Sequence, residues 1–183
     1  FPPEFESRTV YPLLAKPVGR GTVLLGKYLG ALAASLSALA VFYLAYAVLI
    51  GVRQGAWFPP VLLQAFFLHV GLLGVVSALG VLGSLLLTPS ANLTFCALTV
   101  AGMLLFGQRL PVFAATQPLP GKCVLGLIHW LGPHLELFDL RQRVVHAWPP
   151  ISWGVCAVVL AYGAAYAAAC LALAACVFKR KRL

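Results

Sequence analysis

Residues 61–87 read VLLQAFFLHVGLLGVVSALGVLGSLLL, and His69 is the only ionisable side chain among them. An apolar helix of about 20 residues crosses the hydrocarbon core of a bilayer, so this stretch can span it, tilted or extending past it. Three further apolar stretches lie at 29–50, 92–110 and 152–178. Because the bilayer core offers no water to backbone groups, the sequence predicts an all-α, polytopic membrane helix bundle with four transmembrane helices.

The overall composition excludes an ordinary soluble domain. Of 183 residues, 62% are hydrophobic and 9% are charged, and the mean hydropathy is +0.96. Soluble domains carry about 25% charged residues, so this chain cannot cover itself with a polar surface. The formal net charge is +9. The basic residues flank the apolar stretches, which is typical of membrane anchoring, and no nucleic-acid partner is expected.

The positions of Lys and Arg predict the orientation in the membrane. The basic residues at the chain ends are Arg8, Lys16, Arg20, Lys27, Lys179, Arg180, Lys181 and Arg182, and those between the spans are Arg53, Arg109, Lys122, Arg141 and Arg143. Four spans bring both ends to one side, and the positive-inside rule makes that side the cytoplasm. We therefore expect a multi-pass protein of the cell inner (plasma) membrane with both termini cytoplasmic and 111–150 on the outer side.

The segment 111–150 is rich in proline and too polar to cross the bilayer. A Gly-Pro pair at 132–133 divides it into two short helical stretches, which predicts an outer re-entrant or interfacial hairpin. Asp139 and Arg143 have the i,i+4 spacing of a helical ion pair, and Glu136 falls on the same face. Because no metal-ligand or H-E-x-x-H spacing is present, we expect a solvated ionic face rather than a catalytic site.

The remaining polar groups of the spans have structural explanations. No Asp or Glu lies in any span, so a proton relay lacks its usual carrier, and His69 is expected as a neutral imidazole bonded to a neighbouring helix. The five cysteines show neither C-x-x-C nor metal-ligand spacing and are expected to be buried apolar side chains. No metal or other cofactor is expected.

Residues 21–28, GTVLLGKY, have the skeleton of a phosphate-binding loop. Tyr28 stands where that loop needs a Ser or Thr hydroxyl for magnesium, and no strand is expected before it, so we do not expect this chain to bind ATP. Gly26 and Gly30 are four residues apart, as is Gly80 from Ser84, and such pairs let membrane helices approach closely. Helix packing, together with an alanine-rich face at 164–175, is the expected role of these residues.

The most specific pattern lies near the N-terminus, in residues 4–9 (EFESRT), 13–20 (LLAKPVGR) and 25–27 (LGK). It resembles the permease subunits of type-two ABC exporters. In that family a cytoplasmic stretch with an acidic start, a Thr, paired leucines, a Pro-x-x-Arg and a Gly-Lys lies between the second and third membrane helices. Arg8 departs from the pattern, since many members have Gly there. Residues 133–139 (PHLELFD) are similar to a proline-led stretch between the last two helices of relatives.

The resemblance implies that the chain holds helices three to six of six, with Phe1 following two missing helices. It implies a membrane-spanning permease subunit of an ATP-driven transporter, an exporter, in which a separate ATP-binding cassette subunit hydrolyses ATP and pushes on a cytoplasmic coupling segment at 1–28. A second permease copy or homologue would pair with the transmembrane domain at 29–183, and no catalytic residue is expected in this chain. Coupling to the ATPase is expected from Glu4, Glu6, Arg8, Thr9, Leu13, Leu14, Pro17 and Arg20. The candidates for an outer gate are Pro133, Glu136, Phe138, Asp139 and Arg143.

Two other functions stay open on the sequence alone. A non-transporting membrane assembly or scaffold protein would need no ATPase partner, so co-purification with an ATPase separates it from the exporter. A membrane-embedded enzyme would need polar groups that converge at one depth, whereas here they are scattered along 111–150. The sequence does not indicate the transported substrate.

Overall fold

The computed structural model describes residues 19–55, 57–146 and 148–180, and over these ranges the chain is helical with no β-strand. By length and composition, four helical stretches can cross a membrane. They are Gly21–Arg53, Pro60–Leu86, Pro89–Thr116 and Trp153–Arg180. The predicted all-α fold with four spans is therefore confirmed in its helices, although the first helix begins well before residue 29.

The long helices begin and end at proline and glycine. Both α4 (Pro60–Leu86) and α5 (Pro89–Phe106) have proline in the first turn, where the missing N–H breaks no helical hydrogen bond. The first long helix, α3 (Arg20–Gln54), ends at Gly55, which has a φ of 72° and donates its N–H to the carbonyl of Gly51. A left-handed residue at this position is most easily a glycine.

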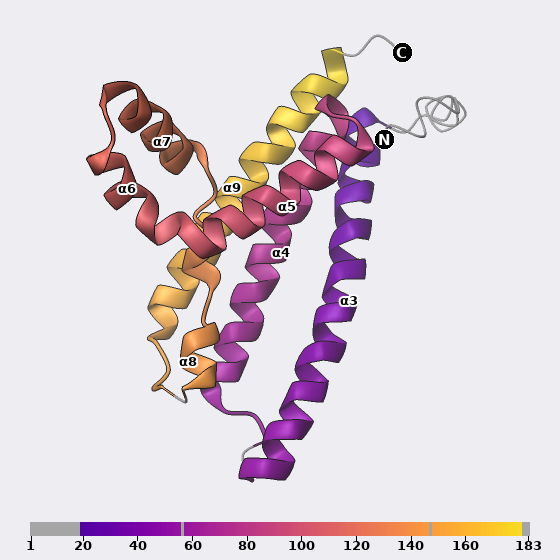
Figure 1. The fold of residues 1–183 in the computed structure, drawn as a ribbon. Helices are drawn as coiled ribbons and strands as arrows, with labels where there is room; N and C mark the ends of the chain where they lie inside the picture. The colour runs from indigo at the N-terminus through magenta and orange to yellow at the C-terminus, as the bar shows by residue number, and fades with distance from the viewer. Residues whose placement is uncertain (1–18, 56, 147, 181–183) are drawn as a thin grey trace.

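Helix α4 lies inside the bundle, where it packs against α3, α5 and above all α9 (Trp153–Arg180). The start of α3 and the end of α9 lie at the same end of the bundle, and the α3–α4 turn lies at the opposite end (Figure 1). Because α3 is helical from Arg20, residues 21–28 are a helix and do not form a phosphate-binding loop.

Five short helices connect α5 to α9. They are η1 (Gly107–Arg109), α6 (Leu110–Thr116), α7 (Leu119–Leu131), η2 (Leu135–Phe138) and α8 (Arg141–Val145). Helices α6 and α7 pack on each other and turn back toward the end of the bundle where α3 begins and α9 ends, whereas α8 lies toward the α3–α4 turn (Figure 1).

The helix break expected at 132–133 is present, because α7 ends at Leu131 and the next helix begins at Leu135. A Cβ at Gly132 would lie 2.6 Å from the carbonyl oxygen of Ile128, so only glycine fits there. The hairpin itself turns elsewhere, at Gln117, which Pro118 holds in an extended conformation. Expecting the two arms of the hairpin on either side of 132–133 was therefore wrong.

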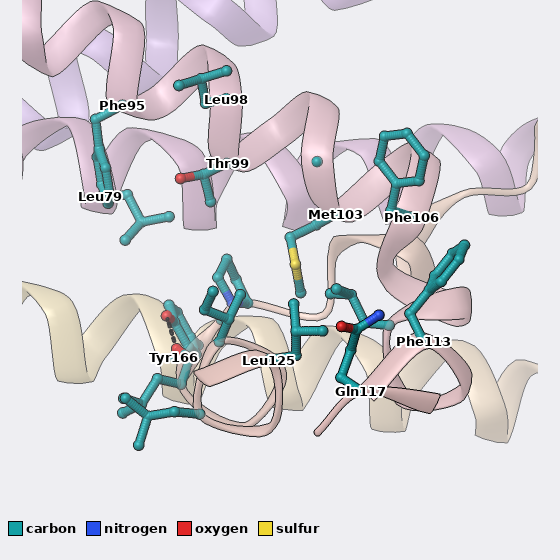
Figure 2. A pocket seen from close by; sticks show the side chains of 17 residues that line it. Leu79, Phe95, Leu98, Thr99, Met103, Phe106, Phe113, Gln117, Leu125 and Tyr166 are labelled. Atoms are coloured by element: carbon teal, nitrogen blue, oxygen red, sulfur yellow. Dashed lines mark hydrogen bonds between the residues drawn. The ribbon is translucent and has the colours of Figure 1, made fainter. Parts of the chain in front are cut away.

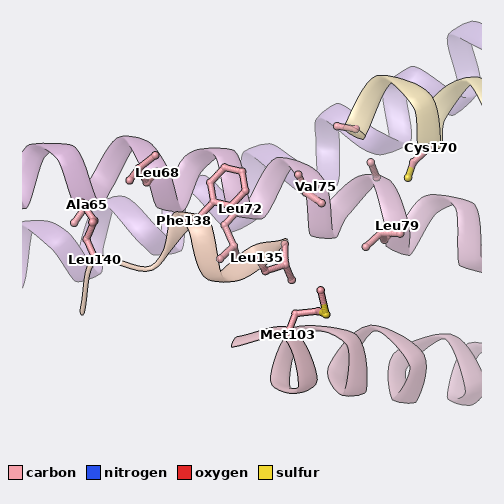
Figure 3. Close-up of a cluster of buried hydrophobic side chains, with 12 residues drawn as sticks. Ala65, Leu68, Leu72, Val75, Leu79, Met103, Leu135, Phe138, Leu140 and Cys170 are labelled. Atoms are coloured by element: carbon pink, nitrogen blue, oxygen red, sulfur yellow. The ribbon is translucent and has the colours of Figure 1, made fainter. Parts of the chain in front are cut away.

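The main core cluster joins α4 to α9, α5 and the connecting segment (Figure 3). In α9, Ala167, Cys170 and Ala174 are buried, which confirms the packing face expected at 164–175. The expectation that all five cysteines are buried was wrong for Cys123 and Cys176, which are exposed on their helices.

The glycines that permit close packing differ from those expected. A Cβ at Gly26 or Gly30 would meet no described atom within 4 Å, so the expected close contact at these residues is not formed. Close approaches lie instead at Gly71, Gly83 and Gly163, where an added Cβ would come within 3 Å of another side chain. Spacing alone does not separate a packed glycine from an open one, because all of them lie on long helices.

Candidate functional site

The expected coupling residues lie mainly outside the part of the chain that the structure describes. Glu4, Glu6, Arg8, Thr9, Leu13, Leu14 and Pro17 belong to residues 1–18. Arg20 is described as the first residue of α3. It begins this helix at the end of the bundle where α9 ends with Lys179 and Arg180 (Figure 1).

Phe138 attaches the connecting segment to the membrane helices. Its side chain is fully buried (Figure 3). A Cβ at Gly71 of α4 would lie 2.8 Å from Phe138 Cε1, and one at Gly163 of α9 would lie 2.7 Å from Cζ. The ring thus packs against two glycines that face each other across α4 and α9. Between membrane helices such a contact is stabilised by close van der Waals packing, and it anchors η2 on both helices.

Asp139 pairs with Arg141, which corrects the expected pair with Arg143. Because η2 ends at Phe138 and Asp139 has φ −88° and ψ 104°, no continuous helix brings residues 139 and 143 together. Instead, Oδ1 of Asp139 accepts 2.9 Å hydrogen bonds from the backbone N–H and from Nε of Arg141, and Oδ2 accepts a 2.7 Å bond from Nη2. The local side-chain-to-backbone bond is typical of an Asx turn.

The environment of Asp139 acts on its pKa in two directions. Partial burial raises the pKa of this carboxyl, but the hydrogen bonds and positive charge of Arg141 outweigh burial and lower it below its usual value. Asp139 is therefore ionised at neutral pH and neutralises the guanidinium beside it.

The other two charged gate candidates have separate environments. Nη1 of Arg143 donates a 3.0 Å bond to the carbonyl of Pro149, and its guanidinium lies 6.0 Å from the ring centre of Trp148. Oε2 of Glu136 is buried and has no hydrogen-bond partner among the described residues. A Cβ at Gly107 would come 2.5 Å from that oxygen. The expectation that Glu136 shares a solvated ionic face with Asp139 and Arg143 was therefore wrong.

His69 lies in α4 and contacts α3. Its Nδ1 is 2.8 Å from the hydroxyl oxygen of Tyr43 and 2.9 Å from the carbonyl oxygen of Ala65, one turn earlier. A carbonyl can only accept, which assigns a hydrogen to Nδ1. The predicted role of His69, an imidazole hydrogen-bonded to a neighbouring helix, is confirmed.

A cavity of about 780 Å³ lies between α5, the α6–α7 hairpin and α9 (Figure 2). Its walls are almost entirely apolar, and Pro133 is part of them. Among its few polar side chains, the Tyr166 hydroxyl already donates a 2.9 Å hydrogen bond to the carbonyl of Leu131. A cavity of this size and lining suits hydrocarbon rather than water.

The base of the hairpin is tied to α9 by two tyrosines that the sequence analysis missed. The hydroxyl of Tyr162 accepts a 3.1 Å bond from the backbone N–H of His134, and Tyr166 bonds to Leu131 as described above. The i,i+4 spacing of these tyrosines in an alanine-rich helix was a signal for a shared polar contact. No group of three metal-ligating side chains occurs among the described residues.

Comparison with known proteins identifies the family. A family model described as an ABC-2 family transporter protein matches residues 3–183. Searches of curated proteins and of solved structures found no match. The membrane permease of this family carries no catalytic ATPase domain and implies an ATP-binding cassette partner. The chain, with its four apolar helices, belongs to the ABC-2 family of transporter proteins as a membrane permease component.

Proposed function

We propose that this permease exports its substrate, and that residues 1–28 dock on the ATPase at the cytoplasmic face. The observation that carries the proposal is the family match, which begins at residue 3 and so includes the coupling pattern at 4–20. The start of α3, which follows this pattern in the chain, lies at the same end of the bundle as the end of α9 (Figure 1). That end of α9 carries Lys179 and Arg180. Basic residues favour the cytoplasmic side.

The gate is the second part of the proposal. Residues 133–143 are part of the segment that joins α5 to α9, and Phe138 holds them against α4 and α9, so a shift between these helices must move η2. Close-packed contacts have a few distinct arrangements, so a small shift between helices can switch the connecting segment from one arrangement to another. Pro133, Glu136, Phe138, Asp139 and Arg143 would form an outer gate through this packing. A second permease copy or homologue would supply the other half of the path.

The coupling role is tested by replacing Leu13 and Leu14 with Asp. Buried charges cost several kcal/mol when unpaired, so the double variant is expected to lose the ATPase on co-purification, or to retain it with ATP hydrolysis no longer linked to export. The four helices should still insert into the membrane. A matched control places two Asp residues at Lys181 and Leu183, at the other end of the chain.

Two results would contradict the coupling role. One is a double variant that binds the ATPase and exports like the unchanged protein. The other is a control variant that loses the ATPase equally, because the effect would then follow from added charge anywhere at this face. If the protein never co-purifies with an ATPase, this result would favour a role as a non-transporting scaffold.

A further inference from the structure

A second cavity, of about 420 Å³, lies between α3, α4 and α8, apart from the large apolar cavity. Its walls come from residues 39–46 of α3, 62–69 of α4 and 141–145 of α8. Small-molecule sites have volumes of about 300–1,000 Å³, and a water molecule occupies about 30 Å³, so the cavity has the size of a small organic molecule. None of the residues named for the coupling role or for the gate lines it.

The cavity combines apolar walls with polar groups that have no hydrogen-bond partner among the described residues. The Tyr46 hydroxyl forms no hydrogen bond with any described residue, and Nη1 of Arg141 is not used in the pair with Asp139. His69 also lines the cavity, and its Nε2 forms no hydrogen bond with any described residue. Such a lining offers several hydrogen-bonding groups to a ligand.

The charges around the cavity favour an uncharged ligand. Arg141 is the only charged residue in the described lining, and Asp139 already neutralises it at 2.7 Å. A carboxylate or an ammonium group entering this cavity would leave water without gaining a net opposite charge, which is unfavourable. A hydroxyl or carbonyl group can use the free donors at far lower cost.

The shape of one wall favours a ring. The side chains of Phe42 and Tyr46 are parallel, with an interplanar angle of 3° and ring centres 6.4 Å apart. Tyr43 lies edge-on to Phe42. Flat aromatic surfaces bind rings by stacking and edge contacts.

From these observations we propose that the cavity between α3, α4 and α8 is a binding site for an uncharged, ring-bearing amphiphile with one hydroxyl or carbonyl group. The ring packs against Phe42 and Tyr46, and the polar group bonds to Tyr46, His69 or Arg141. The site lies within the membrane helices near α8, so its ligand enters from the lipid phase. The assignment does not depend on the coupling role of residues 1–28.

A photolabelling experiment tests this site. The permease, with its ATPase partner in lipid nanodiscs, is irradiated with 2-naphthol carrying an aryl diazirine, and labelled peptides are identified by mass spectrometry. Label is expected in α3, α4 and α8. Competition uses 2-naphthol, naphthalene and 2-naphthoate, which share one ring system and differ in polarity and charge. Because one hydrogen bond contributes about 1 kcal/mol, 2-naphthol should compete at about fivefold lower concentration than naphthalene, and 2-naphthoate should compete least.

Two variants and a control complete the test. Val145 lines the cavity from an exposed position, so V145W should fill it and abolish the label without disturbing the core. V158W places the same residue on an exposed position of α9 outside the cavity, and labelling should be unchanged. Y46F removes only the hydroxyl and should reduce the advantage of 2-naphthol over naphthalene.

Three outcomes would overturn the proposal. Label spread evenly over all lipid-exposed helices would show partition into lipid instead of a site. Undiminished labelling of correctly assembled V145W would place the probe elsewhere. Competition by 2-naphthoate as strong as that by 2-naphthol would show that the site accepts charge, contrary to the ligand class assigned here.

Discussion

At the scale of single residues, Gln64 decides how α9 starts. It is 1% exposed and is the only polar side chain buried in the described part of the core. Its Nε2 donates a 2.7 Å bond to the carbonyl of Ile151, and its Oε1 accepts a 3.1 Å bond from the Ile151 N–H. One amide therefore satisfies both backbone groups of a residue just before α9, and it ties that residue to α4.

Replacing Gln64 with Met should destabilise the permease by about 2–4 kcal/mol, because two backbone groups of Ile151 lose their partners while the side-chain volume is nearly kept. The measurement is unfolding in detergent followed by tryptophan fluorescence. Gln142 is exposed on α8 and its side chain makes no hydrogen bond to described residues, so Q142M is the matched control and should change little. Equal effects of the two substitutions would rule out the proposed clamp.

A second prediction at this scale concerns the ion pair. A double-mutant cycle with D139N and R141Q should give a coupling of up to about 1 kcal/mol, the range for partly exposed pairs, since the Arg141 side chain is 59% exposed. The same cycle with D139N and R143Q should give coupling near zero, because Arg143 bonds to Pro149 instead. A stronger coupling of Asp139 to Arg143 than to Arg141 would contradict the observed pair and favour the i,i+4 pair expected from the sequence.

At the scale of elements, the packing of η2 depends on one glycine in α4 and one in α9, which contact the same side chain of η2. Phe138 fills the space between Gly71 and Gly163, and the distances of 2.8 and 2.7 Å to an added Cβ leave no room for alanine at either position. This contact, rather than the charged residues nearby, fixes the connecting segment on the bundle.

Gly163→Ala should therefore cost about 1–3 kcal/mol, because Phe138 must shift within a close-packed core. Thermal unfolding of the purified permease measures the loss. Adding Phe138→Leu to G163A should recover part of it by making room for the methyl group. G102A is the control, since no described atom lies within 4 Å of a Cβ there, and alanine should be neutral or slightly stabilising in a helix. An unaffected G163A variant would contradict the anchoring role of Phe138.

At the scale of the whole molecule, the arrangement predicts which residues are reached from each side of the membrane. The α3–α4 turn and α8 lie toward one end of the bundle, and the start of α3 with the end of α9 lies at the other (Figure 1). If the termini are cytoplasmic, as their basic residues favour, α8 faces outward.

In a variant without native cysteines, R143C should react with an impermeant thiol reagent on intact cells, whereas K181C should react only after the membrane is opened. The same labelling with the sides reversed would invert the proposed orientation and place the coupling segment away from any cytoplasmic ATPase. Labelling of R53C, at the end of α3, provides an independent check and should match R143C.

The sequence by itself determined the four membrane helices and the helix break at 132–133. Both depend on local properties: an apolar stretch long enough for the bilayer favours a helix, and a Gly-Pro pair disfavours a continuous one. The residues proposed for coupling also rest on the sequence alone, because they form a linear pattern at 4–20.

Only the tertiary structure decided how the connecting segment meets the bundle. Spacing along one helix predicted that Asp139 pairs with Arg143 and that Gly26 and Gly30 are closely packed. The actual partners are Arg141 for Asp139 and, for Phe138, glycines from two distant helices. Such contacts depend on how helices pack across long sequence separations, and local spacing carries no information about that packing.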